Sequence, residues 1–374
     1  MPSVCVIGTR GYPSYYGGFE TAVRHLAPYL SARGWDVSVY GRGTSQSKLL
    51  TKGDRAVTSI NTPGFESKSL STLSYGLTST MHAATKKPDV ALVMNVANGF
   101  WLPLLRARNI PSVVNVDGLE WTREKWGRLA RGVFYSGARM TAKFGDSLIF
   151  DAKAIGEYWS DTFKRQGTWI PYGGVDSPGR QFAEGFAAGR YVLAVARLVP
   201  ENTIPEFLKA AENLARQTPV VLVGSSGYGS ELDERARHLS ETNSNFHWLG
   251  HVHDDDRLFS LWKNAAVYFH GHSVGGTNPA LVQAMMLGAP TVARDTVFNR
   301  EVLGGAAFFT APSPESIETS INELLADPAK QDHFSREARM RAEELYTWER
   351  VNSAYENTLS DAVERAKTGR KFIG

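Results

Sequence analysis

The residue types best suited to chemistry in this sequence lie in one stretch, Gly271–Gly288, where a polar, glycine-rich loop precedes an apolar helical segment. Thr277 or Asn278 suits the N-cap of this helix, and Pro279 suits its first position, where a missing N–H is tolerated. Such a helix start presents unpaired backbone N–H groups and a partial positive charge, which favour a bound phosphate. The stretch therefore predicts an anion site, with a simple capped turn of an α/β sheet as the alternative.

Three more residues of the same stretch extend the expected site beyond the phosphate. Gly275 and Gly276 place no side chain between a ligand and the backbone. Gln283 falls about one turn into the helix. Its amide is placed there to hydrogen-bond a group that lies beside the phosphate.

A second glycine-rich loop, Gly8–Glu20, follows the first apolar run of the chain. Its glycine pair, Gly17 and Gly18, stands just before a helical segment and again lets backbone N–H groups approach a phosphate. The loop lacks the GxGxxG spacing, so a nicotinamide dinucleotide site is not expected. The alternative is a flexible glycine turn, although the loop is long for a connection between a strand and a helix.

Charged residues also follow two apolar runs that are predicted to be strands. Asp117 comes directly after Ser112–Val116, where a carboxylate without a partner would be costly. It either caps the next turn or faces a ligand, because polar residues at strand ends line the ligand crevice of parallel sheets. Arg197 follows Tyr191–Val195, and its planar fork of donors suits a diphosphate.

Other polar or reactive residues predict structure more readily than a ligand site. The loop Asn95–Gly99 is typical of structural asparagine caps. The run Asp254–Asp256 precedes the segment Arg257–Lys263, and acidic residues are favourable at a helix start, so we prefer that interpretation to a metal site. The single cysteine, Cys5, lies in an apolar run, which predicts a buried thiol and no internal disulfide.

These motifs are spaced along a chain in which apolar runs alternate with amphipathic segments. Runs such as Val90–Met94 are typical of strands buried on both faces of a parallel sheet. The segment Trp169–Asp176 has the proline and glycines of a domain boundary, and the pattern restarts after it. We therefore expect two doubly wound α/β domains, 1–172 and 173–350, and a final helix in 351–374 that packs back on the first domain.

The charge of the chain is unevenly distributed. Residues 1–170 contain 21 Lys and Arg against 12 Asp and Glu, and the rest contains 20 against 26, although the net charge is only +3. The segment Trp121–Lys143 interleaves aromatic residues with the bases Arg123, Lys125, Arg128, Arg131, Arg139 and Lys143. A basic, aromatic helix can lie on an anionic membrane surface, and a solvated helix face is the alternative. Nucleic-acid binding is not expected, because no recognised module is present and the second half is acidic.

Composition and patterning do not favour a membrane-spanning or a secreted protein. No apolar run reaches the roughly 18–20 residues that span a bilayer. The first residues lack the basic region of a signal peptide and are typical of a strand. With one cysteine, the default expectation is a cytoplasmic protein.

Nearly the whole chain resembles the retaining GT-B glycosyltransferases of family 4, in particular the bacterial subgroup that includes rhamnosyltransferases of polysaccharide biosynthesis. The resemblance rests on Gly8–Thr21, Asn115–Trp121, Arg197–Asn202, Gly271–Pro279 and Phe298–Leu303. It implies a GT-B fold of two Rossmann-like doubly wound domains facing across a cleft. The N-terminal domain would hold the acceptor and the C-terminal domain the nucleotide-sugar.

The resemblance also implies roles for individual residues. The donor diphosphate would be contacted by Gly17, Gly18, Arg197, Thr277 and Asn278. Gly275, Gly276 and Gln283 would contact the donor sugar and nucleoside. Asp117 or Glu120 would orient or deprotonate the acceptor hydroxyl. No metal or other cofactor is expected, because arginine and helix N–H groups would neutralise the leaving diphosphate.

The chain departs from the pattern of the wider family at several positions. Gly275 and Gln283 stand where that family has two glutamates, Asn202 stands for a lysine, and Asp117 stands for a histidine. The expected function is transfer of a hexosyl or deoxyhexosyl group, with rhamnosyl as one candidate, from a nucleotide-sugar to a saccharide or lipid-linked acceptor at the inner membrane face, with retention. The departures suggest the alternative, a non-catalytic sugar-nucleotide-binding or scaffold subunit of a polysaccharide assembly system.

Overall fold

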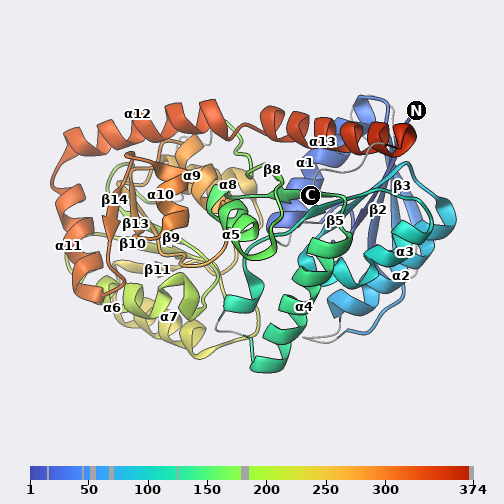
Figure 1. Ribbon diagram of the computed structural model, residues 1–374. Coiled ribbons are helices and arrows are strands. Elements are labelled where there is room, and N and C mark those ends of the chain that lie inside the picture. The colour runs from blue at the N-terminus through green and yellow to red at the C-terminus, as the bar shows by residue number, and fades with distance from the viewer. Residues whose placement is uncertain are drawn as a thin grey trace. The chain divides into compact units, whose positions relative to one another are not determined.

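In the computed structural model, the apolar runs of the first half of the chain form an eight-stranded sheet (Figure 1). The structure describes residues 1–14, 17–43, 46–50, 56–66, 71–123, 126–177 and 185–369, and of residues 46–50 the backbone alone. The strands are β1 (Ser3–Ile7), β2 (Asp36–Arg42), β3 (Gln46–Leu50), β4 (Ala56–Thr62), β5 (Val90–Met94), β6 (Ser112–Asn115), β7 (Ser147–Phe150) and β8 (Thr168–Trp169). Their order is β3-β4-β2-β1-β5-β6-β7-β8, and each neighbouring pair is parallel except β3 with β4.

Helices pack on this sheet, and the last helix of the chain is one of them. They are α1 (Gly18–Ala32), α2 (Ser71–Lys86), α3 (Leu102–Ala107), α4 (Arg128–Phe144), α5 (Lys153–Phe163) and α13 (Trp348–Thr368), with short 3-10 turns η1 (Val96–Trp101) and η2 (Glu120–Thr122). α13 packs on α1, where the rings of Trp348 and His25 stack at a centroid distance of 4.1 Å. It also reaches the sheet, because Asn115 Nδ2 donates to the Tyr355 hydroxyl at 2.6 Å.

The chain divides into two compact units, Met1–Tyr172 with Trp348–Gly374, and Gly173–Thr347. The second unit has a six-stranded parallel sheet in the order β11-β10-β9-β12-β13-β14. Its strands are β9 (Val192–Val195), β10 (Val220–Val223), β11 (Phe246–Trp248), β12 (Val267–His270), β13 (Thr291–Arg294) and β14 (Phe308–Thr310). Its helices are α6 (Ile204–Leu214), α7 (Glu231–Thr242), α8 (Asp255–Lys263), α9 (Pro279–Met286), α10 (Val297–Leu303), α11 (Pro314–Leu325) and α12 (Pro328–Leu345), with a 3-10 turn η3 (Pro200–Asn202).

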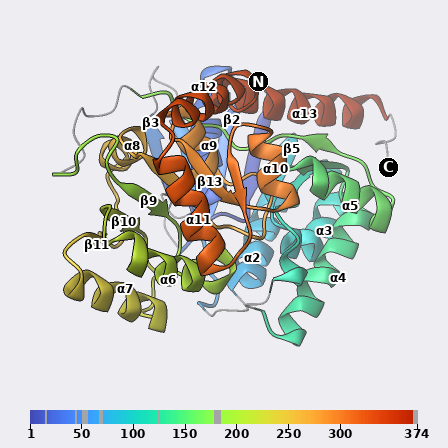
Figure 2. The same ribbon diagram turned by 90° about the vertical axis from the view of Figure 1, so that its left-hand side faces the viewer.

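One face of the second sheet is covered by α6, α7 and α11 (Figure 2). Apolar side chains from β9, β10, β12 and β13 pack with these helices in one buried cluster. Within it, the rings of Phe207 on α6 and Phe269 on β12 stack at 4.9 Å. The intervening residues Leu193, Val221 and Tyr268, which point to the other face, are buried too. Burial of both faces explains the short, nearly continuous apolar runs of the sequence.

Both units have the strand order of a doubly wound sheet. β1 lies between β2 and β5, and β9 lies between β10 and β12, so the direction of winding reverses beside the first strand of each unit. In such sheets the ligand binds at the carboxyl ends of the strands near this reversal. The predicted α/β class, with two Rossmann-like domains, is confirmed.

Several elements match the expectations closely, and two differ. Val90–Met94 is a strand with the expected bounds, and the apolar runs Ser112–Val116 and Tyr191–Val195 contain β6 and β9. The antiparallel pairing of β3 was not predicted, because alternation within a strand does not indicate the direction of its partner. The final helix, expected in 351–374, begins earlier, at Trp348, and Tyr346 and Thr347 separate it from α12.

Candidate functional site

The predicted anion site lies at the carboxyl end of β12, where the loop of residues 271–278 leads into α9. Asn278 is the N-cap, since its side-chain oxygen accepts a hydrogen bond from Ala280 N at 2.9 Å. Pro279 occupies the first turn of the helix. The predicted helix start is confirmed, with Asn278 rather than Thr277 as the cap.

The first three residues of this loop are held by hydrogen bonds with residues that follow the neighbouring strands. Thr203 Oγ1 donates to Gly271 O at 2.5 Å, Asn299 Nδ2 donates to His272 O at 3.0 Å, and Ser273 N donates to Glu201 O at 3.1 Å. Residues 274–277 form a short arch between these anchors and the N-cap. Gly275 in the arch has a φ of +109°, a conformation that favours glycine. The loop is therefore fixed at both ends, as a preorganised anion site requires.

Gln283 has a structural contact that the sequence did not indicate. Its Oε1 accepts from Val175 N at 2.9 Å, and its Nε2 donates to Val175 O at 2.8 Å. The residue is 8% exposed. The amide thus ties α9 to the segment that opens the second unit. One lone pair and one N–H of the amide remain for a ligand, so the contact with a donor nucleoside stays a prediction.

Arg197 lies just beyond the end of β9, and β9 is a neighbour of β12 in the sheet. Its side chain is exposed, and it has no hydrogen bond or ion pair with another residue in the described ranges. The buried side chain of Asn202 donates to Arg197 O at 2.9 Å. Asn202 therefore fixes the backbone from which the guanidinium extends.

In the first unit, the loop that precedes α1 is described except for Tyr15 and Tyr16. Gly17 is the N-cap of α1 with a φ of +115°, and no side chain caps the helix. A Cβ added to Gly18 would stand 2.9 Å from the Tyr172 hydroxyl oxygen. Both glycines are thus required by the local backbone or packing, whether or not a phosphate binds there.

Carboxylates gather near that tyrosine at the carboxyl edge of the first sheet. Tyr172 is buried, and its pKa is raised well above the usual value, first by burial and then by the negative charges of Asp117, Asp151 and Glu20. Burial also raises the pKa of Glu20. Asp151 was not identified from the sequence, although it follows the apolar run Leu148–Phe150 as Asp117 follows its own strand.

Asp117 is half-buried at the end of β6, with a φ of +62°. Its Oδ2 accepts from Asn95 Nδ2 at 3.3 Å, and its backbone N donates to Asn115 Oδ1 at 3.0 Å. Asn95 also caps η1, accepting from Ala97 N at 2.9 Å, as predicted for that loop. These bonds fix the position of the Asp117 carboxylate.

Glu120 has a different environment from Asp117. Its Oε1 lies 2.8 Å from Arg123 Nε, and its Oε2 accepts from Trp126 Nε1 at 2.9 Å. The residue is 5% exposed. Both carboxylate oxygens of Glu120 therefore bind neighbouring side chains. A catalytic role for Asp117 or Glu120 stays a prediction.

The basic segment divides into a buried part and an exposed part. The Arg123 side chain is 12% exposed against Glu120, and Arg131 Nε donates to Arg123 O at 3.2 Å. Arg128 is exposed near the start of α4, and Leu129 beside it is 85% exposed. Arg139 and Lys143 are exposed further along α4. Lys125 lies outside the described residues.

Two other predictions concern metals and membranes. Asp254 is the N-cap of α8 and accepts from Asp256 N and Arg257 N, so the predicted helix start is confirmed. Among the residues that the structure describes, no group of three or more His, Cys, Asp or Glu is arranged to hold a metal ion. Within the same residues, no helix has the length and apolar character needed to cross a membrane.

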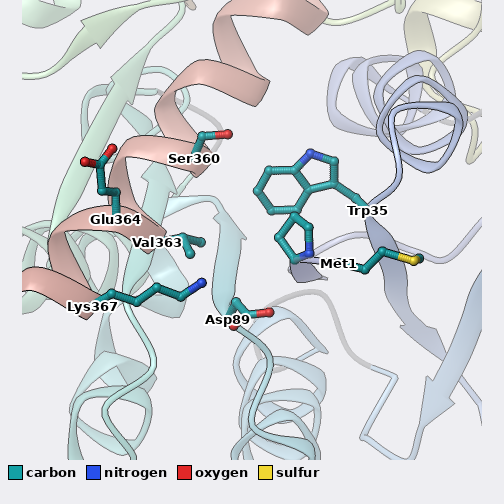
Figure 3. A pocket seen from close by; sticks show the side chains of 8 residues that line it. Met1, Trp35, Asp89, Ser360, Val363, Glu364 and Lys367 are labelled. Carbon is teal, nitrogen blue, oxygen red and sulfur yellow. The ribbon is translucent and has the colours of Figure 1, made fainter.

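A pocket of about 400 Å³ lies at the other end of the first sheet (Figure 3). Trp35, Asp89 and Lys367 are among its lining residues, and they stand near the amino ends of β2 and β5 and on α13. Ligands of doubly wound sheets bind at the carboxyl ends. This pocket is therefore not the candidate site.

Comparisons with known proteins give two family matches and several solved structures with a similar fold. Residues 181–341 match the family described as Glycosyl transferases group 1, and residues 1–175 match DUF1972, a domain of unknown function. No curated protein sequence matches the chain.

Solved structures with the same fold include sucrose-phosphate synthase from Thermosynechococcus elongatus, with a TM-score of 0.81, 18% identity, and coverage of 96% of this chain and 99% of that chain. They also include Anabaena HepE in complex with UDP-glucose, with a TM-score of 0.72, 17% identity, and coverage of 96% of this chain and 100% of that chain. A third is an alpha,alpha-trehalose-phosphate synthase (UDP-forming) from Burkholderia vietnamiensis, with a TM-score of 0.71, 12% identity, and coverage of 97% of this chain and 100% of that chain. The chain therefore has the GT-B fold, and most of its second unit matches the Glycosyl transferases group 1 family.

Proposed function

We propose that this protein transfers a hexosyl or deoxyhexosyl group, with rhamnosyl as one candidate, from a nucleotide-sugar to a hydroxyl of a saccharide or lipid-linked saccharide, with retention of configuration. The observation that carries the proposal is the anchored glycine arch before α9, together with the Arg197 guanidinium at the end of the neighbouring strand, which has no partner among the described residues. UDP-glucose is bound in HepE, which shares the fold. A nucleoside diphosphate leaving group fits these cationic and N–H donors.

On the donor side, the second unit would stabilise the charge that develops on the leaving diphosphate. The backbone N–H groups of the arch and of the start of α9, with Thr277 and Asn278, would bind phosphate oxygens, and Arg197 would add a fork of charged donors. Gly275, Gly276 and Gln283 would contact the sugar and nucleoside. Gly17 and Gly18 offer a second set of helix N–H groups from the first unit.

On the acceptor side, Asp117 would orient the attacking hydroxyl. The bond between the anomeric carbon and the diphosphate oxygen breaks, a bond to the acceptor oxygen forms, and the acceptor proton passes to the departing diphosphate or to Asp117. Tyr172, Asp151 and Glu20 would keep this edge polar and acidic, which suits neutral hydroxyl groups. We further propose that arginine and N–H donors replace a divalent cation, so that chelation with EDTA leaves the rate unchanged.

The test of the proposed function is turnover of the donor. Purified protein is incubated with a panel of nucleotide-sugars, and release of the nucleoside diphosphate is measured with and without saccharide acceptors. We expect release from one donor, accelerated by an acceptor. Binding of a nucleoside diphosphate without release from any nucleotide-sugar would favour the alternative, a non-catalytic scaffold subunit.

We also propose that α4 attaches the protein peripherally to an anionic membrane surface. The helix has no acidic residue, and Arg128, Leu129, Arg139 and Lys143 are exposed on it. Arg123 is excluded from this surface by its contact with Glu120. Each cation near such a surface contributes about 1 kcal/mol.

The membrane proposal is tested with vesicles of phosphatidylcholine with and without phosphatidylglycerol. Replacing Arg128, Arg139 and Lys143 together by Gln should abolish the preference for the anionic vesicles. Arg216→Gln, an exposed cation of the second unit, is the control. Equal binding by the triple variant and the control would support the alternative interpretation, in which this face of α4 is only solvated.

A further inference from the structure

Arg294 ends β13, on the side of β12 opposite to the strand of Arg197. The order β9-β12-β13 therefore places the glycine loop between two strands that each end near an arginine. Neighbouring strands are about 4.8 Å apart, so the ends of β9 and β13 are separated by about 10 Å. That spacing can accommodate a diphosphate over the end of β12.

The side chain of Arg294 lies across the base of the loop. Its Nη1 donates to Thr203 Oγ1 at 3.0 Å, although Thr203 follows β9 and Arg294 belongs to β13. The guanidinium must therefore cross the end of β12. The same Thr203 hydroxyl donates to Gly271 O, the first residue of the loop. This chain of bonds holds the guanidinium beside the anchored start of the arch.

The guanidinium of Arg294 is half-buried and has no carboxylate partner among the described residues. The adjacent carboxylate, Asp295, binds Arg300 instead, at 2.5 Å and 2.7 Å. Arg341, another half-buried arginine of this unit, donates to two backbone carbonyls. A partly desolvated cation held by one neutral hydroxyl is costly unless an anion completes its environment.

We propose that Arg294 is a second cationic ligand of the donor diphosphate, and that Thr203 positions it. The proposal rests on the proposed function, because it assigns a further residue to the same donor site. One of the five N–H donors of Arg294 is used by Thr203, and the others are available to phosphate oxygens. Arg197 and Arg294 then approach the diphosphate from the two strands that flank β12.

The first experiment measures affinities of purified protein for a nucleoside diphosphate, the monophosphate and the nucleoside by calorimetry. UDP, GDP, ADP and dTDP are compared first on the wild-type protein. For the one that binds, Arg294→Gln should weaken the diphosphate complex about 10- to 100-fold, and the nucleoside complex should be unchanged. Arg294→Lys should weaken the diphosphate complex less. Arg300→Gln is the matched control, since it removes the same charge from an exposed arginine that already has a partner.

The outcomes separate the two proposals. If the wild-type protein binds none of the diphosphates, the proposed function fails and the role of Arg294 fails with it. If the wild-type protein binds one and Arg294→Gln binds it equally well, only the inference about Arg294 fails.

A second experiment does not depend on the folding of a variant. Wild-type protein is treated with phenylglyoxal, and modified arginines are identified by mass spectrometry. The bound diphosphate should protect Arg197 and Arg294 but not Arg300. Equal modification of Arg294 with and without the diphosphate would overturn the inference.

Discussion

The carboxyl edges of the two sheets differ in charge, and each opposes the net charge of its half of the chain. The first edge gathers Asp117, Asp151 and Glu20 near the Tyr172 hydroxyl, although residues 1–170 have an excess of nine positive charges. The second edge carries Arg197 and Arg294 without carboxylate partners in the described residues, although its half has an excess of six negative charges.

This difference shows that net charge and site charge are set by different residues. Much of the basic excess of the first half is solvated, as at Arg128 and Arg139 on α4. The residues that end the strands are few, and they determine what a site can bind. An edge whose guanidinium groups have no carboxylate partner among the described residues suits an anionic donor, whereas an edge with fixed carboxylates suits the hydroxyl groups of an acceptor. Substitutions at the two edges should therefore have separable effects.

The largest expected effect is that of Arg197→Ala on the donor side. Loss of the exposed guanidinium should lower kcat/KM for the nucleotide-sugar about 100-fold or more, because charge on the leaving diphosphate loses a preorganised donor. The affinity for the acceptor should change little. Arg216→Ala removes an exposed arginine of the same unit, just after the end of α6, and serves as the control. An unchanged kcat/KM in Arg197→Ala would remove this residue from the site.

The next effect is expected for Asp117→Asn on the acceptor side. Transfer should slow about 10- to 100-fold, with the donor affinity preserved. The fold should be spared, because asparagine tolerates the positive φ of this position and its amide oxygen can still accept from Asn95. Steady-state kinetics with the donor and the acceptor varied separately checks this split. Full activity would leave Asp117 with only a structural function.

Glu120→Gln should lower stability and preserve turnover, whereas Asp117→Asn should slow transfer and preserve the fold. The substitution leaves Arg123 without its carboxylate partner in a largely buried setting and should lower the free energy of unfolding of the first unit by about 1–3 kcal/mol. The kcat of the folded enzyme should stay close to that of the wild type. Chemical denaturation and kinetics on the same preparation test this. A loss of turnover with unchanged stability would reassign Glu120 to catalysis.

Much of the fold and part of the site were predictable because their signals are local. The apolar runs indicated strands, Asn278 and Asp254 had the side chains of N-caps, and Cys5 lay in an apolar run. Burial raises the pKa of the Cys5 thiol to about 12, which agrees with an inert core residue. Each of these inferences needs only the spacing of neighbouring residues.

The missed features depend on contacts between distant segments. The two hydrogen bonds between Gln283 and Val175 join residues 108 positions apart, and the hydrogen bond between Arg294 and Thr203 joins residues 91 positions apart. Such pairs are set by the order of strands in the sheet, which the spacing of apolar residues does not specify. Asp151 was missed for the same reason, since its significance appears only when Tyr172 and Asp117 are brought near it.

The smallest expected effect is a change in stability at acid pH. It compares a buried histidine of the first unit with one of the second. The pKa of His25 in the first unit is lowered to about 4, mainly by burial and then by Arg24. The folded state thus favours the neutral ring. This stabilisation is present above the unfolded value of about 6.5 and is lost as the pH falls from there towards 4. In the second unit, burial and then His272 lower the pKa of His270 well below its usual value.

His25→Phe keeps an aromatic ring against Trp348 and removes the titration. Between pH 6.5 and 4, the free energy of unfolding of the first unit should therefore fall by roughly 1–2 kcal/mol less in the variant than in the wild type. Denaturant titrations with tryptophan fluorescence across this range measure the difference. Because His270 is untouched, the acid response of the second unit should be the same in both proteins. Parallel curves for the first unit would show that the burial of His25 does not favour the neutral ring over the charged one.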